Sequence, residues 1–114
     1  MAENYYQTAI ENEDIFRNVL RDLRDNRKER PMGAYVPEDL ETEANLQDIF
    51  TKYSGGYRYG KFTIILFSRL TTDNLARIIF QDIACLSGGG ADLEYVVNPD
   101  NSVVFKKAVT TWRS

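Results

Sequence analysis

The feature that most constrains the fold is FTIILF, a run of almost entirely apolar residues at 62–67. It is far shorter than the roughly 20 apolar residues that a membrane-spanning helix needs. Its β-branched residues favour a strand buried on both faces. A run this short is also compatible with the start of a helix, because periodicity does not separate the two. We therefore expect a buried strand at 62–67, and a fold that combines helices with a sheet.

Residues 1–30 have the pattern of one amphipathic helix. Apolar side chains recur on one face at about 100° per residue, at Tyr5, Ala9, Phe16, Val19, Leu20 and Leu23. Pro31 disfavours helical geometry at the residue before it, so this helix should end by Arg30. Two prolines and a glycine in 31–37 predict a connector without regular structure.

Two further helices are expected downstream. The first spans 42–54, where apolar residues follow the i, i+3, i+4, i+7 spacing, at Leu46, Ile49, Phe50 and Tyr53. The second follows Thr71 and Thr72, and its apolar face consists of Leu75, Ile78, Ile79, Ile83 and Leu86. Three glycines at 88–90 are predicted to cap this helix and to turn the chain.

The C-terminal segment predicts a hairpin. Strands at 93–97 and 103–109 flank the sequence NPDN at 98–101, and proline at its second position is typical of a turn. Simple alternation along the last strand separates two sets of side chains: Val103, Phe105 and Val109 on one face, and Val104 and Ala108 on the other.

These elements predict the α+β class, with two N-terminal helices followed by a β-α-β-β unit. The sheet is expected to be small, three-stranded and mixed, and to pack on the helices. A right-handed crossover would make the first two strands parallel, and the hairpin would be antiparallel. A chain of 114 residues with 43% hydrophobic content suits one core. We expect a single domain over 1–114, with the β-α-β-hairpin unit at 57–114.

The composition removes most of the catalytic chemistry that a sequence can reveal. The chain has no histidine, which is the commonest general base and zinc ligand. Its only cysteine, Cys85, has apolar neighbours and is expected to be an inert core thiol, which indicates a reducing compartment. We expect no catalytic residue, no cofactor and no metal site. The acidic N-terminus resembles no secretory signal, so a cytoplasmic location is expected.

The charge pattern bears on the kind of partner. The net charge is −3, and this balance argues against nucleic-acid binding. A basic stripe on the first helix, Arg17, Arg21, Arg24 and Lys28, either contacts an acidic partner or pairs with acids of the same helix, and we favour the pairing. The acidic residues Glu38, Asp39, Glu41 and Glu43 suit a helix N-terminus or a basic target.

We therefore expect a small non-enzymatic adaptor or regulatory protein that binds another protein and forms a homodimer. A three-stranded sheet covered on one side leaves a face and edges that a second subunit could cover. The interface candidates are Val104, Phe105, Trp112, Tyr57 and Tyr59. The alternative is an acidic inhibitor or immunity-type protein that occupies a basic site. A small enzyme that uses Tyr, Asp or Lys is the least favoured class.

Overall fold

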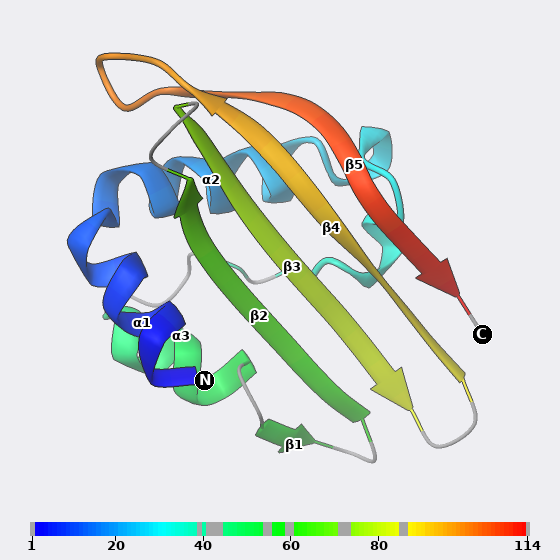
Figure 1. Cartoon of the computed structure of the whole chain (residues 1–114). Coiled ribbons are helices and arrows are strands. Elements are labelled where there is room, and N and C mark those ends of the chain that lie inside the picture. Colours follow the sequence, from blue (N-terminus) through cyan, green and yellow to red (C-terminus); the bar gives the residue numbers. More distant parts are fainter. Residues whose placement is uncertain are drawn as a thin grey trace.

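The computed structural model describes residues 2–38, 40, 45–53, 56–58, 61–70, 74–84 and 87–113. Within them, helices α1 (Ala2–Glu11), α2 (Glu13–Asp25) and α3 (Leu46–Tyr53) precede a single antiparallel sheet (Figure 1). Its strands lie side by side in chain order: β1 (Gly56–Arg58), β2 (Lys61–Leu70), β3 (Leu75–Ala84), β4 (Ser87–Val97) and β5 (Val103–Arg113). The expected α+β class is confirmed, and the strand expected at 62–67 is the first part of β2.

The expected three-stranded mixed sheet is wrong. In the described residues four long antiparallel strands form a meander, and the short β1 adds to the edge of β2. The helix expected after Thr72 is instead β3, which pairs with β2 on one side and β4 on the other. Both faces of β3 carry apolar side chains, such as Ile78 and Ile79, so the period of two was obscured and a helical spacing fitted equally well.

The three glycines at 88–90 are strand residues of β4, so the helix cap expected there is also wrong. A Cβ atom on Gly89 would lie 2.5 Å from the ring of Tyr35. One on Gly90 would lie 2.4 Å from the carbonyl oxygen of Phe80 and 2.9 Å from the indole nitrogen of Trp112. Glycine in a strand allows such close approach of neighbouring groups.

The N-terminal helix expected at 1–30 is divided at Asn12. Its side-chain amide donates to the Thr8 carbonyl over 3.0 Å, and its backbone N–H donates to the same oxygen over 3.1 Å. Such a side chain competes with the helical pattern and bends the chain. The α-helix ends at Asp25, a 3₁₀ turn covers Arg27–Glu29, and Arg30 is extended before Pro31 as predicted.

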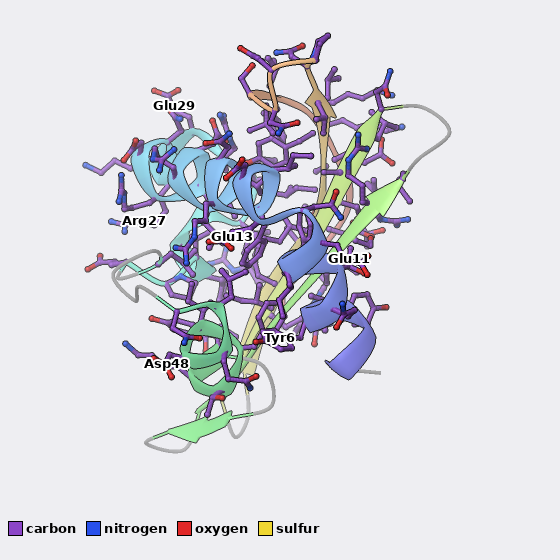
Figure 2. All side chains as sticks on the ribbon, turned by 90° about the vertical axis from the view of Figure 1, so that its left-hand side faces the viewer. Tyr6, Glu11, Glu13, Arg27, Glu29 and Asp48 are labelled. Atoms are coloured by element: carbon purple, nitrogen blue, oxygen red, sulfur yellow. The ribbon has the colours of Figure 1, made fainter. Side chains whose placement is uncertain are left out.

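The core lies between the helices and one face of the sheet, which we call the inner face. A chain of ring contacts joins α1, α3, α2 and β2, because Phe50 contacts Tyr6 and Phe16, and Phe16 contacts Phe67. The centroid distances are 5.5, 5.6 and 4.9 Å. Figure 2 shows the helices gathered on one side of the strands, with α1 beside the edge of β2.

The hairpin between β4 and β5 is confirmed. Asn101 donates its N–H to the Asn98 carbonyl, and Asn98 donates to the Ser102 carbonyl, each over 2.9 Å. Asn101 has φ of 70°, as in a three-residue loop that closes with a left-handed residue. The strands on either side are longer than the sequence indicated, since the hairpin spans Ser87 to Arg113.

The core position of β2 generates a testable contrast between two isoleucines. Ile65 is 1% exposed on the inner face of β2, whereas Ile10 is 42% exposed on α1. We expect Ile65→Ala to lower the free energy of unfolding by about 2–5 kcal/mol, because a buried side chain is lost and a cavity remains. Ile10→Ala should change it by less than about 0.5 kcal/mol. Urea unfolding of both variants checks this, and equal losses would contradict the inner position of Ile65.

Candidate interaction surface

The sheet has a second face that points away from the helices, and we call it the open face (Figures 1 and 2). Strand register places these side chains on it: Leu66, Ser68, Leu70, Leu75, Arg77, Ile79, Gln81, Asp92, Glu94, Val96, Val104, Lys107, Thr110 and Trp112. Leu75 is buried, yet it does not belong to the core cluster between the helices and the sheet. Among the described residues, the helices all lie on the other side or beside the edge of β2.

One row of the open face is apolar across all four long strands. Leu70 pairs with Leu75, Leu75 with Val96, and Val96 with Val104. Directly opposite side chains in neighbouring strands contact one another, so the row forms a continuous apolar ridge. Val104 at its end is 56% exposed, the largest value among the exposed large hydrophobic residues of the described chain.

The next row is polar, and its three charged members alternate in sign. It consists of Ser68, Arg77, Glu94 and Lys107, which are paired in register. Arg77 also forms a fork with Asp92, where Nε donates to Oδ1 over 2.6 Å and Nη2 donates to Oδ2. Asp92 raises the pKa of Arg77 above its ordinary value through these hydrogen bonds. The Glu94 carboxylate lies 3.9 Å from the Nζ of Lys106.

Two irregularities in β5 change the faces that simple alternation predicts. The register between β4 and β5 shifts between Asp92 and Leu93, and again between Glu94 and Tyr95. The shifts leave Val109 and Lys106 without a paired residue, as in β-bulges. Ala108 therefore pairs with Leu93 on the inner face, and the expectation that it shares a face with Val104 is wrong.

Phe105 also lies on the inner face, where its ring contacts members of a part-buried polar network. Its ring contacts the Tyr95 ring at a centroid distance of 5.7 Å, and the Arg30 guanidinium lies 4.6 Å from its centroid. Asp22 accepts hydrogen bonds from Arg30 Nη2 and Nε over 2.7 and 2.9 Å, and from the Tyr95 hydroxyl over 2.6 Å. Asn26 completes the network with a 3.0 Å bond to Asp22.

The network has opposing effects on ionisation. Burial raises the pKa of Asp22, but the hydrogen bonds from Arg30, Tyr95 and Asn26 outweigh it and hold that pKa below the ordinary value. Burial, with the neighbouring Asp22 carboxylate, raises the pKa of Tyr95, so its hydroxyl stays protonated and donates. The network thus joins α2, the residue before the connector and β4 around an ionised carboxylate.

The basic stripe is separated from the open face, because it lies on α2 and the turn that follows. Arg17 pairs with Glu13 and Arg24 with Asp25, each over 3.0 Å, and Arg21 donates to Asn18 over 2.8 Å. Pairing of the stripe within the helix is therefore present. Lys28 is exposed on the 3₁₀ turn.

The remaining predicted residues are only partly described. Glu38 has a side chain that is 81% exposed and lies 3.1 Å from Arg27. Tyr57 pairs with Phe62 between β1 and β2, but its side chain is not described. The predicted contact residues Asp39, Glu41, Glu43 and Tyr59 lie outside the described residues. Cys85, predicted to be an inert thiol, also lies outside them. The structure brings Val104 and Trp112 to one face and leaves Phe105 on the other.

Comparison with known protein families, curated proteins and solved structures finds no match. Within the described residues there is no group of three or more Cys, Asp or Glu side chains that could hold a metal ion. No described helix is long and apolar enough to cross a membrane.

Neither arginine fork was predicted from the sequence. Asp22 and Tyr95 are 73 residues apart, and only the tertiary fold brings them together. A signal for the outer fork was present, because ADLEYVV at 91–97 alternates charged and apolar residues. That alternation predicts a strand with Asp92 and Glu94 on one face. The fork itself is not predicted, because the spacing around Arg77 indicates a helix and not a neighbouring strand.

The buried network predicts a pH-dependent effect of one hydroxyl group. The pKa of Asp22 lies below 3.8, so its ionised form stabilises the fold above pH 3.8, and this contribution is lost as the pH falls further. Tyr95→Phe removes one donor to this carboxylate. We expect the free energy of unfolding to fall by about 1–3 kcal/mol at neutral pH. The difference from the wild type should shrink as the pH falls below 3.8.

Urea unfolding at neutral and acid pH measures this difference. Tyr6→Phe is the matched control, because its partly exposed ring lies on α1 away from Asp22. The control should show no change of the difference with pH. A Tyr95→Phe deficit of the same size at both pH values would contradict the role of Asp22.

Proposed function

We propose that this protein is a non-enzymatic adaptor or regulatory protein that binds a protein partner with the open face of its sheet. The observation that carries the proposal is the apolar row across β2 to β5, which ends at the exposed Val104. Contiguous apolar side chains on one face are typical of an interaction site, whereas scattered ones are not. Leu75 within the row is 8% exposed and Leu70 and Val96 are partly exposed, so Val104 is the member most accessible to a partner.

The charges of the open face favour a protein over a polyanion. Basic residues alternate with acidic ones along the charged row, so the face has no uniform positive field of the kind that phosphate groups need. Arg77 is already paired with Asp92, and Glu94 lies near Lys106. A partner that covers the face therefore encounters compensated charges, which lowers the cost of removing them from water.

One hollow of the described chain offers little for acid–base catalysis. A hollow of about 280 Å³ lies where α1 meets α2, beside the hairpin turn. Its lining combines carboxylates and amides with two isoleucines: Ile10, Glu11, Asn12, Glu13, Asp14, Ile15 and Asn101. Acid–base catalysis usually combines groups whose environments separate their pKa values, and this lining offers carboxylates alone for that purpose.

Site-specific photo-crosslinking tests the proposal. A photoreactive benzoylphenylalanine at position 104 should form a covalent adduct with a protein in lysate of the producing cells, because Val104 ends the apolar row. The same group at the exposed Lys28 position should form none. Adducts at 28 without adducts at 104 would contradict the proposal and would favour the basic stripe as the contact surface.

A further inference from the structure

We propose that the partner is a second copy of this chain, packed open face to open face about a two-fold axis that runs along the strands between β3 and β4. This inference rests on the proposed function, because it names the occupant of the same surface. Two-fold dimers use one patch on both subunits, so the patch must be complementary to itself. The register of the central strands provides this complementarity.

The proposed axis exchanges β3 and β4, and it keeps each row of the sheet opposite the same row of the second copy. Arg77 pairs in register with Glu94, so each Arg77 would face the Glu94 of the second copy. Leu75 pairs with Val96 in the apolar row, so these two would also face each other across the interface. Sheets packed face to face keep their strands within about 30°, so the match holds best near the axis.

The outer strands fit the same arrangement. The axis places β5 over the β2 of the second copy, and Val104 then lies over Leu70. The whole apolar row is therefore covered by apolar side chains. An axis across the strands through the row of Arg77 and Glu94 would instead place Arg77 over Arg77 and Glu94 over Glu94, which brings like charges together.

The size of the open face agrees with a stable interface. Four strands of 10 or 11 residues form it, and strand spacings of about 4.8 Å and 3.3 Å per residue give a projected area of roughly 600 Å². Protruding side chains raise the accessible area above this projection, and a standard interface buries about 800 Å² per partner.

The exposed edge of the sheet disfavours pairing by strand addition. β5 is the last strand of the sheet, and its edge carries Lys106, Lys107 and Arg113 together with two register shifts. Lysines and bulges are the devices by which natural sheets prevent edge-to-edge association. A second copy is therefore expected to pack on the open face and not to pair with the edge of β5.

A mixing experiment with two charge reversals tests the arrangement on the full chain. In Arg77→Glu, each new glutamate would face Glu94 of the second copy, and in Glu94→Arg each new arginine would face Arg77. Each variant alone should associate at least about tenfold more weakly than the wild type. An equimolar mixture should restore the dimer, because each mixed pair again places opposite charges together.

Sedimentation equilibrium measures the mass against the 13.1 kDa of one chain. The matched controls are Lys28→Glu and Glu29→Arg, which make the same charge changes on the exposed turn after α2, far from the open face (Figure 2). Both controls should dimerise as the wild type does. Val104→Lys, at a position that is already exposed, should also weaken association at least about tenfold, and it keeps the test decisive if Arg77→Glu does not fold.

The outcomes separate this inference from the proposed function. Weak association of each variant with recovery on mixing supports the inference, as does weak association of Val104→Lys. A wild type that stays monomeric overturns the inference that the partner is a second copy. An adduct of position 104 with a different protein would then leave the proposed function standing. A wild-type dimer that Arg77→Glu, Glu94→Arg and Val104→Lys do not affect, or folded charge variants that fail to recover on mixing, would overturn the arrangement.

Discussion

A sheet has two faces, and in the described part of this chain the helices cover one of them. This constraint organises the rest of the structure. The strands are long and carry apolar residues on both sides, as Ile78 and Ile79 show. The inner face is closed by α2 and α3 through aromatic contacts, and α1 protects the edge of β2. The remaining face has to combine apolar area with enough charge to be compatible with water.

An arginine–aspartate fork lies on each side of the sheet, and both carboxylates are largely enclosed, with side chains 18% exposed at Asp22 and 12% at Asp92. On the inner side, Arg30 and Asp22 are joined by Tyr95 and Asn26, so the buried carboxylate has several donors. A buried charge is stable only when such donors replace water. On the open face, Arg77 and Asp92 have the same forked geometry without a covering layer of described residues. Of the outer pair, the Arg77 side chain is 34% exposed and can meet a partner, whereas Asp92 is buried.

The glycines of β4 connect these two sides. Gly89 admits the ring of Tyr35 from the connector, and Gly90 admits the indole of Trp112 from β5. A side chain at either position would displace an aromatic ring that covers the strand. Because glycine has no side chain, β4 makes no side-chain contacts of its own at these positions, and the neighbouring rings fill the space. The run of glycines that suggested a turn thus allows close packing within the sheet.

The sequence by itself determined the α+β class, the amphipathic N-terminal segments, the strand at 62–67 and the final hairpin, because local spacing and turn chemistry specify these features. Only the tertiary structure decided that β3 is a strand, since its apolar pattern fits both periods until neighbours on both sides supply hydrogen bonds. The tertiary structure also decided the face of the sheet on which Ala108 lies, and the network that joins Asp22 to Tyr95. Bulges and contacts between distant segments depend on pairing partners, and no local pattern in one sequence encodes them.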